Sequence, residues 1–303
     1  MIDVQFRDPP PIRAQLFWFV YLPPESHAQL TGMPENTAAR HTLLRGLPLN
    51  SDSKNTHILA IHAHPDDIEI QCAGTLLKLK NQGCRISVAT MTPGDCGSAE
   101  LGQEAIAQVR RTEAQAAAEL LGAEYTCLEF RDLSIVFDND SRRRMTEFLR
   151  RTKADIILTA PPVDYMHDHE MTSMLVRDAC FNASVPNYKT QQWDPATPNV
   201  KIPHLYYVDA IEGTDHFGVR HPIDFTVDIS SVFEQKLESL ACHASQRDWL
   251  KRQHGMDEYL DSCRRWSAER GREIGTDYGE GFRQYKAHPH PTDNLLLKLL
   301  EDA

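Results

Sequence analysis

The stretch Ile58-Leu59-Ala60-Ile61-His62-Ala63-His64-Pro65-Asp66-Asp67 decides the fold. Its first five residues are a short run, mostly apolar, of the kind that forms a buried strand. Two carboxylates, Asp66 and Asp67, follow a few residues later, where the chain is expected to enter a helix. In an open parallel sheet, ligands bind beyond the carboxyl ends of the strands. The residues directly after this strand are therefore the first place to look for function.

The same alternation of short apolar runs with longer helical segments continues along the chain from residue 56. This is the βαβ signature of a parallel sheet. We predict an α/β fold, Rossmann-like, with a mostly parallel sheet and helices on both faces. After the strand at 58–62, further strands are expected at 85–91, 125–130, 155–159, 205–209 and 225–229.

Glycines mark the ends of the predicted helices, because the residue after a helix commonly adopts a left-handed conformation. Gly83 is expected to end the helix that follows the first strand, and Gly122 to end an Ala-rich helix over 105–121. Residues 232–272 predict two helices with a break near Gly255.

Changes in composition and in hydrophobic periodicity along the chain predict three regions. Residues 1–52 are Pro-rich and show no sustained period, so we expect a poorly structured N-terminal extension. Residues 53–275 form the expected catalytic domain, and residues 276–303 are predicted to be a C-terminal tail.

The composition favours a globular protein that acts on a small molecule. Hydrophobic residues are 41% and charged residues 25% of the 303 residues, close to the averages of soluble proteins. The net charge of −11 argues against nucleic acid and against an anionic membrane surface, because both need clustered Lys and Arg. The composition leaves a homo-oligomer open.

The cysteines indicate a reducing compartment. There are seven, an odd number, and none forms a C-x-x-C pair, which is unlike a disulfide framework. The apolar run at 16–22 is short for a signal peptide and far too short for a membrane span. We therefore expect a cytoplasmic protein.

The turn after the first strand is suited to a cation. A dinucleotide-binding protein carries G-x-G-x-x-G there, whereas this chain carries Asp66 and Asp67, which repel a phosphate. The simplest alternative is that one of them only caps the helix. His64 favours the metal, since imidazole and carboxylate are zinc ligands and a catalytic zinc takes three of them and a water.

A second motif follows the strand at 155–159. Met166-His167-Asp168-His169 lies just past the carboxyl end of that strand, so the two motifs are expected to meet at one edge of the sheet. Histidines on both sides of an aspartate favour a metal site over a solitary core histidine. Asp168 is also placed to orient a ligating imidazole.

These motifs together resemble the PIG-L/LmbE-like family of zinc-dependent N-deacetylases. The match rests first on Ala63-His64-Pro65-Asp66-Asp67 and on the later Asp168-His169. Arg110-Arg111-Thr112-Glu113 is similar to the family's R-x-x-E helix, and His243-Ala244-Ser245-Gln246 is similar to its C-terminal segment. The resemblance covers residues 56 to about 250 and implies an LmbE-like fold.

The resemblance also implies roles for single residues. His64, Asp67 and His169 would hold Zn²⁺, and Asp66 would be the general base in the removal of an acetyl group from an N-acetylated amino sugar or conjugate. Zinc lowers the pKa of a bound water toward about 7. Asp66 would accept the proton of that water and deliver a proton to the leaving amine.

One position departs from the family pattern. The family commonly reads H-x-D-H, and Met166 stands where the first histidine is usual. Methionine donates no hydrogen bond, so the task of binding substrate or stabilising the oxyanion is either lost or relocated, with Arg110, His167 and His243 as candidates. The competing interpretation of Arg110 is a surface pair with Glu113, three residues further along the helix.

Three other functions remain open from the sequence. The same zinc could hydrate an activated double bond, as hydratases of this family do. Two histidines and a carboxylate also describe the facial triad of non-haem iron oxygenases. Finally, a binding protein without catalytic activity could retain the metal pocket, in which case Asp66 would be dispensable.

Overall fold

The computed structural model describes residues 55–247 and 259–301, which belong to a unit that runs from residue 49 to residue 303. The expected N-terminal extension at 1–52 and the expected break near Gly255 lie outside the described residues. Among the described residues, no helix is both long enough and apolar enough to span a membrane.

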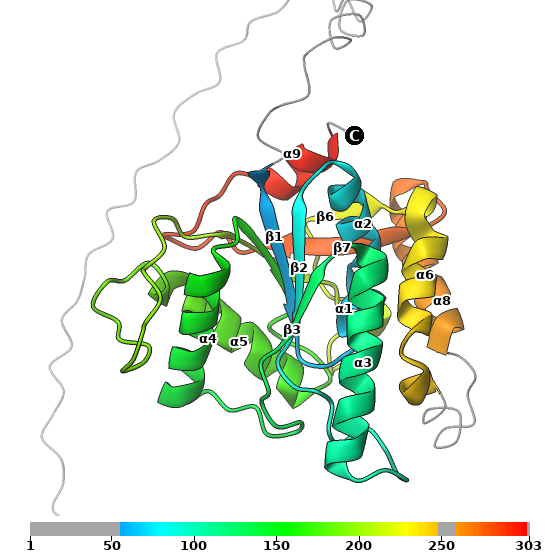
Figure 1. Cartoon of the computed structure of the whole chain (residues 1–303). Coiled ribbons are helices and arrows are strands. Elements are labelled where there is room, and N and C mark those ends of the chain that lie inside the picture. Colours follow the sequence, from blue (N-terminus) through cyan, green and yellow to red (C-terminus); the bar gives the residue numbers. More distant parts are fainter. Residues whose placement is uncertain (1–54, 248–258, 302–303) are drawn as a thin grey trace, which may run out of the picture. The chain divides into compact units, whose positions relative to one another are not determined.

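A seven-stranded sheet organises this unit (Figure 1). The strand order is β3-β2-β1-β4-β5-β7-β6, and the first five strands in this order are mutually parallel. β7 runs antiparallel to both of its neighbours. The Rossmann-like, mostly parallel α/β fold predicted from the sequence is therefore confirmed. The strands are β1 (His57–His62), β2 (Arg85–Thr90), β3 (Glu124–Cys127), β4 (Ile156–Thr159), β5 (His204–Val208), β6 (Phe225–Asp228) and β7 (Gly279–Gln284).

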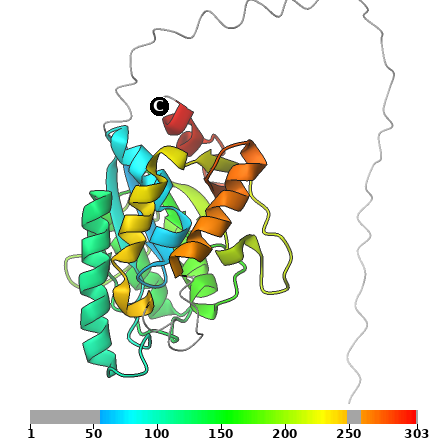
Figure 2. The same ribbon diagram turned by 90° about the vertical axis from the view of Figure 1, so that its right-hand side faces the viewer.

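Helices cover both faces of the sheet. Figures 1 and 2 show α3, α6 and α8 side by side on one face, with α4 and α5 on the other. Gly83 and Gly122 adopt left-handed conformations, with φ of 90° and 63°, directly after α2 and α3 as predicted. The helices are α1 (Asp67–Gln71), α2 (Ala73–Asn81), α3 (Gln103–Leu121), α4 (Asn139–Thr152), α5 (His167–Asn182), α6 (Phe233–Ala241), α8 (Tyr259–Ile274) and α9 (Leu295–Glu301), with 3-10 turns η2 (Ile211–Gly213) and η3 (Ser230–Val232).

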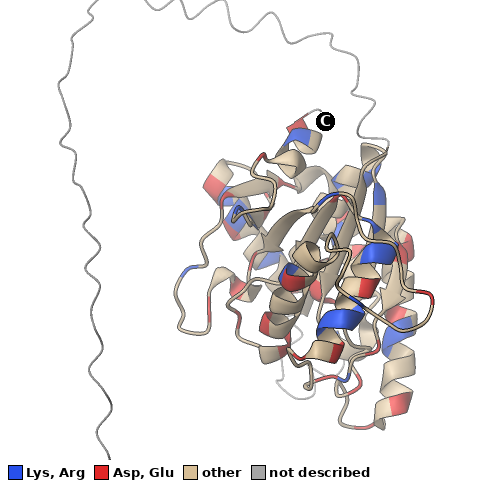
Figure 3. Cartoon of the chain, turned by 90° about the vertical axis from the view of Figure 1, so that its left-hand side faces the viewer, with Lys and Arg blue, Asp and Glu red and all other residues tan. Residues whose placement is uncertain are grey.

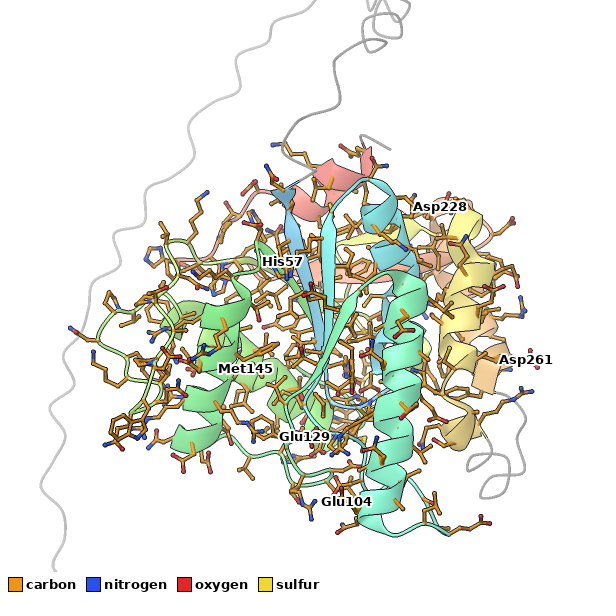
Figure 4. All side chains as sticks on the ribbon, viewed as in Figure 1. His57, Glu104, Glu129, Met145, Asp228 and Asp261 are labelled. Atoms are coloured by element: carbon orange, nitrogen blue, oxygen red, sulfur yellow. The ribbon has the colours of Figure 1, made fainter. Side chains whose placement is uncertain are left out.

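Two hydrophobic cores lie on opposite faces of the sheet, because successive side chains of a strand point to opposite sides. Ile58 and Ala60 of β1 join the core beneath α2, α6 and α9. Leu59 and Ile61 join the core beneath α4 and α5, where Met145 points from α4 toward the sheet (Figure 4). A strand buried on both faces reads as a continuous apolar run, which is why β1 is recognisable in the sequence.

The segment at 276–303, expected to be a C-terminal tail, contains an interior strand of the sheet, β7. β7 pairs with β5 on one side and β6 on the other, and Phe282 is fully buried. The carboxylate of Glu280 accepts hydrogen bonds from the backbone N–H groups of Gly74 and Thr75, at the start of α2. It also pairs with the buried Lys236 at 2.6 Å. These residues therefore complete the fold behind the first motif.

The strand order also fixes where a site can form. β2 and β3 lie on one side of β1, whereas β4 and β5 lie on the other. The direction in which successive strands are added to the sheet therefore reverses between β1 and β4. Such a switch point leaves a crevice at the carboxyl ends of the two strands. In Figure 4, His57 marks the amino ends of the parallel strands, and Glu129, just after β3, marks their carboxyl ends. Figure 3 shows Lys and Arg interspersed with Asp and Glu on one side of the molecule.

Candidate metal centre and active site

The turn after β1 is held in an unusual backbone conformation. Asp66 has φ of 101°, in the left-handed region that costs a non-glycine residue about 1–3 kcal/mol. Arg110 of α3 braces this turn, because its Nη2 donates a 2.7 Å hydrogen bond to the carbonyl of Pro65. Its Nη1 bonds the carbonyl of Gly94, where a Cβ would lie only 2.1 Å from that nitrogen. Arg110 is buried, so its interpretation as a surface residue is wrong.

The carboxylate of Asp67 is the centre of a buried cluster. His64 Nδ1 and His169 Nε2 each lie 3.4 Å from one of its oxygens. His62 Nδ1, at the end of β1, is closer at 2.6 Å. Burial alone would raise the pKa of Asp67, but His169 and His62 hold it well below its ordinary value. The structure therefore brings His64, Asp67 and His169 together as the sequence predicts, and adds His62.

Further carboxylates lie next to the ring nitrogens of His64 and His169 that point away from Asp67. His64 Nε2 lies 3.0 Å from Asp132 and 3.4 Å from Asp168, and His169 Nδ1 lies 3.0 Å from Asp164. Burial would lower the pKa of both histidines, and these carboxylates together with Asp67 raise it. A carboxylate behind an imidazole is the usual way in which a metal-ligating histidine is oriented.

The donor set fits a divalent cation. Two groups of three buried side chains have ligand atoms within 4.8 Å of one another: His62, Asp67 and His169, and His64, Asp132 and Asp168. His169 Nε2 and His62 Nε2 are buried and make no hydrogen bond to any described residue. Imidazole and carboxylate groups are the donors that zinc takes in catalytic sites.

Asp66 has partners different from those of Asp67. Its carboxylate accepts a 2.8 Å hydrogen bond from the hydroxyl of Tyr259 in α8, and Arg110 Nη2 lies 3.7 Å away. Burial raises the pKa of Asp66, against the opposing charges of Arg110 and His243. A carboxyl group with a raised pKa, beside a metal-type cluster, has the properties of a general base.

The segment His243-Ala244-Ser245-Gln246 packs against α3. Glu113 accepts hydrogen bonds from both the backbone N–H and the hydroxyl of Ser245. His243 is fully buried, with Nε2 3.3 Å from Glu69, and its charge acts on Asp66. The R-x-x-E helix thus braces two motifs: Arg110 holds the turn after β1, and Glu113 holds this segment.

The residues around the first turn of α5 differ in their exposure and in their contacts. Asp168 is buried and accepts a 2.7 Å hydrogen bond from the backbone N–H of Leu133. His167 is exposed, and no described residue makes a hydrogen bond or ion pair with it. Tyr165 stands edge-on to His169 with ring centres 5.4 Å apart. The structure therefore gathers Asp168 into the cluster and leaves His167 outside it.

Several members of the site were not found in the sequence. His62, Asp132 and Asp164 lie just beyond or at the ends of strands, so a systematic search of the residues around every strand end would have found them. Tyr259 comes from the far end of the chain and carries no local signal.

A buried group of imidazoles and carboxylates at the switch point of a Rossmann-like sheet defines an α/β protein with a metal-type centre. Residues 59–180, which contain both motifs, match the family model described as PIG-L: GlcNAc-PI de-N-acetylase. Residues 59–180 therefore carry the PIG-L (LmbE-like) family match, and the resemblance stated from the sequence is confirmed over this part of the chain.

The relatives include both deacetylases and a hydratase. The chain is 26% identical to 4-oxalmesaconate hydratase of Pseudomonas putida over 78% of this chain and 91% of that protein. It is 27% identical to diacetylchitobiose deacetylase of Thermococcus kodakarensis over 62% of this chain and 69% of that protein. The structure of N,N'-diacetylchitobiose deacetylase from Pyrococcus horikoshii aligns with a TM-score of 0.66 and 26% identity, covering 79% of this chain and 88% of that one.

Proposed function

We propose that this protein is a zinc-dependent hydrolase that removes the acetyl group from an N-acetylated amino sugar or its conjugate. His64, Asp67 and His169 hold the zinc ion, and Asp66 is the general base. The observation that carries the proposal is the spacing around Asp67, where His64 Nδ1 lies 3.4 Å from Oδ2 and His169 Nε2 lies 3.4 Å from Oδ1. Ligands 2.0–2.1 Å from a tetrahedral zinc are about 3.3 Å apart, so each of these two distances is compatible with a cation shared between a histidine and the carboxylate.

His62 has a different role in this proposal. Its Nδ1 lies 2.6 Å from Asp67, which is a hydrogen-bond distance and leaves no room for an ion between the two atoms. No carboxylate lies behind its Nε2, in contrast to His64 and His169. His62 therefore orients Asp67, and Asp132 and Asp168 orient His64.

The chemistry follows from the division between the two aspartates. Zinc, when bound, supplies Lewis acidity and lowers the pKa of a water. Asp66 accepts a proton during attack on the amide carbonyl and returns it to the leaving nitrogen. Its burial and raised pKa support this role, because a base is most effective when its pKa approaches the working pH.

The hydrogen bond that Met166 cannot donate is assigned to its neighbour Tyr165. The Tyr165 ring stands edge-on to His169 with ring centres 5.4 Å apart, and the residue is exposed, so its hydroxyl can reach a bound substrate as a hydrogen-bond donor. Of the earlier candidates, Arg110 is committed to the carbonyls of Pro65 and Gly94, and His167 is outside the cluster. His243 acts beside Asp66.

A hydratase is the second candidate function, and Met166 is the observation that favours it. The relative that hydrates 4-oxalmesaconate is matched over 91% of its length. The same metal and the same base would then add water across an activated double bond.

All seven cysteines are unpaired, which supports a reducing, cytoplasmic location in either case.

Metal analysis combined with acetate release tests the proposal. The purified protein is expected to contain one zinc ion and to release acetate from a panel of N-acetylated amino sugars. Asp66→Asn is expected to retain the metal and lose turnover, because only the base is removed. Full activity of this variant would refute the assignment of Asp66. Hydration of an unsaturated dicarboxylate without acetate release would select the second candidate.

A further inference from the structure

A turn at 94–97 contacts both a residue that holds the turn of the proposed base and a residue that lies behind a proposed metal ligand. It follows β2 and closes with a 3.1 Å hydrogen bond from the N–H of Gly97 to the carbonyl of Gly94. Asp95, its second residue, is only 2% exposed. A buried carboxylate costs free energy unless hydrogen bonds and charges compensate it, so the partners of Asp95 indicate what it does.

Asp95 and Asp132 join two loops through a reciprocal pair of hydrogen bonds. Asp95 Oδ1 accepts a 2.9 Å bond from the backbone N–H of Asp132. Asp132 Oδ2 in turn accepts a 3.0 Å bond from the backbone N–H of Cys96. The two loops follow β2 and β3, which are adjacent parallel strands. Because each loop supplies both a carboxylate and an N–H group, a displacement of either loop weakens both bonds.

The second oxygen of Asp132 faces the metal-type cluster. Asp132 Oδ1 lies 3.0 Å from His64 Nε2, whereas the other ring nitrogen of His64, Nδ1, lies 3.4 Å from Asp67. Cys96 holds Oδ2 and Asp95 holds the backbone N–H of Asp132, so the turn fixes the direction in which Oδ1 points. A carboxylate behind a ligating imidazole sets the orientation of its ring. The position of the His64 ring therefore depends on this turn.

Two further side chains hold the turn itself in place. Arg110 Nη1 donates a 3.3 Å hydrogen bond to the carbonyl of Gly94. Gln246 Nε2 donates a 3.1 Å hydrogen bond to the carbonyl of Gly97. Arg110 and Gln246 are both buried. Because both ends of the turn are anchored, the turn cannot shift to compensate for a change at Asp95, and the effect of the change reaches the loop after β3 instead.

The hydrogen bond to the backbone of Asp132 is the contact of Asp95 that matters for the cluster. Asp95 Oδ2 also lies 3.2 Å from Arg131 Nη1, but the side chain of Arg131 is 67% exposed. An ion pair with an exposed partner contributes little, because water screens it. Asparagine retains a carbonyl oxygen that can accept the bond from the N–H of Asp132, whereas alanine has no acceptor. The two substitutions therefore separate the hydrogen bond from the charge.

From these contacts we infer that Asp95 is a positioning residue for the metal centre. It acts through Asp132, which it holds in the orientation that places a carboxylate oxygen behind His64. The inference rests on the proposed function for the role of His64 as a zinc ligand. It makes the affinity for zinc depend on a side chain that belongs to neither of the two metal-binding motifs.

Zinc affinity, measured by competition with a chelator, tests the inference. We expect Asp95→Ala to reduce the affinity about tenfold, the lower end of the effect of removing a group that orients a ligand, because Asp95 acts through an intermediate residue. Asp95→Asn should bind zinc as tightly as the parent protein, since it keeps the acceptor. Arg131→Ala should also bind zinc as tightly, because the ion pair that it removes is exposed.

Asp138→Ala is the matched control. Asp138 also accepts a hydrogen bond from a backbone N–H, that of Ser141 at the start of α4, at 2.8 Å. Its loss should lower the urea concentration of half-unfolding and leave the zinc affinity unchanged, which separates a loss of stability from a loss of positioning. The inference would be overturned by an affinity in Asp95→Ala equal to that of the parent, or by an equal loss in Asp138→Ala. Should Asp95→Ala not fold, Asp95→Glu provides the same comparison, because it keeps the charge and moves the carboxylate by one methylene group.

Failure of the proposed function is distinguishable from failure of this inference. A parent protein that binds zinc but releases no acetate would refute the deacetylase, whereas the loss of affinity in Asp95→Ala would still establish the positioning role. If the parent bound no zinc, the variants would be compared through the ¹⁵N chemical shifts of the His64 ring, assigned with His64→Ala. These shifts should move in Asp95→Ala and not in Asp138→Ala, and unchanged shifts in Asp95→Ala would overturn the inference.

Discussion

Tyr259 donates a 2.8 Å hydrogen bond to the carboxylate of Asp66 across 193 residues of sequence. The two residues come from α8 and from the turn before α1, so the position of the proposed base depends on an element from the far end of the chain. Arg110 holds the same turn from α3. The carboxylate is thus fixed by contacts that are separate from those of the proposed metal ligands.

Removal of the Tyr259 hydroxyl should therefore impair catalysis more than folding. Tyr259→Phe is expected to lower kcat about tenfold while the zinc content stays the same, because the base loses one charge-assisted hydrogen bond of about 1.5–3 kcal/mol. Tyr125→Phe is the matched control, since it removes a hydroxyl that bonds Thr90 instead. Equal loss of kcat in the two variants would show that Tyr259 has no specific role.

The two groups of candidate ligands make different predictions for His62 and His64. We expect His64→Ala to abolish zinc binding, because it removes a ligand. His62→Ala should retain one zinc with an affinity reduced about 10–100-fold, the usual effect of removing a group that orients a ligand. Competition with a zinc chelator, followed by elemental analysis, measures both. The reverse order of affinities would identify His62 as the ligand.

Stability should depend on pH through His57, which lies at the start of β1 and bonds the hydroxyl of Ser87 at 2.8 Å. Burial, followed by the charge of Arg85, lowers the pKa of His57 in the folded protein. The unfolded chain then binds the proton more readily, so the free energy of unfolding falls as the pH drops below the unfolded pKa of about 6.5. His57→Gln should remove this component, so that the free energy of unfolding measured in urea falls less between pH 7.5 and pH 5 than it does in the parent protein. Parallel pH dependence of the two proteins would contradict it.

The buried ion pair of Lys236 and Glu280, which lies behind the first motif, should contribute more to the free energy of unfolding than an exposed ion pair does. Glu280→Gln leaves the ammonium of Lys236 buried without its counter-charge, which is expected to cost about 3–5 kcal/mol in the free energy of unfolding. Lys286→Met breaks the exposed pair with Asp224 and should cost about 1 kcal/mol or less. Urea unfolding measures both changes. Similar losses in the two variants would mean that burial of the first pair has no special weight.

Much of the fold was predictable because the parallel strands are buried on both faces and read as apolar runs. β1 and β2 are examples, and Gly122 marked the end of α3 through its left-handed conformation. β7 was not predictable: Gly279–Gln284 contains two glycines and charged residues, and it becomes a strand because β5 and β6 supply hydrogen bonds on both sides.

The candidate site likewise contains residues that the sequence predicts and residues that it does not. His64, Asp67 and His169 follow strand ends within two short motifs, so sequence reasoning could bring them together. The groups that orient them are contributed by long-range packing: Asp132 follows β3, and Tyr259 belongs to α8. A search around strand ends would have included Asp132, whereas Tyr259 has no local signal and reaches the site only in the folded chain.

The position of β7 has a consequence for the order in which the protein matures during synthesis. The carboxylate that caps α2, directly behind the first motif, belongs to Glu280. A ribosome must therefore translate more than 200 further residues before the strand containing the first motif acquires its finished support. Chains interrupted before β7 would leave one edge of β5 unpaired, α2 without its cap and the ammonium of Lys236 without its counter-charge. Such products should be recognised by proteases rather than accumulate as partially active enzyme.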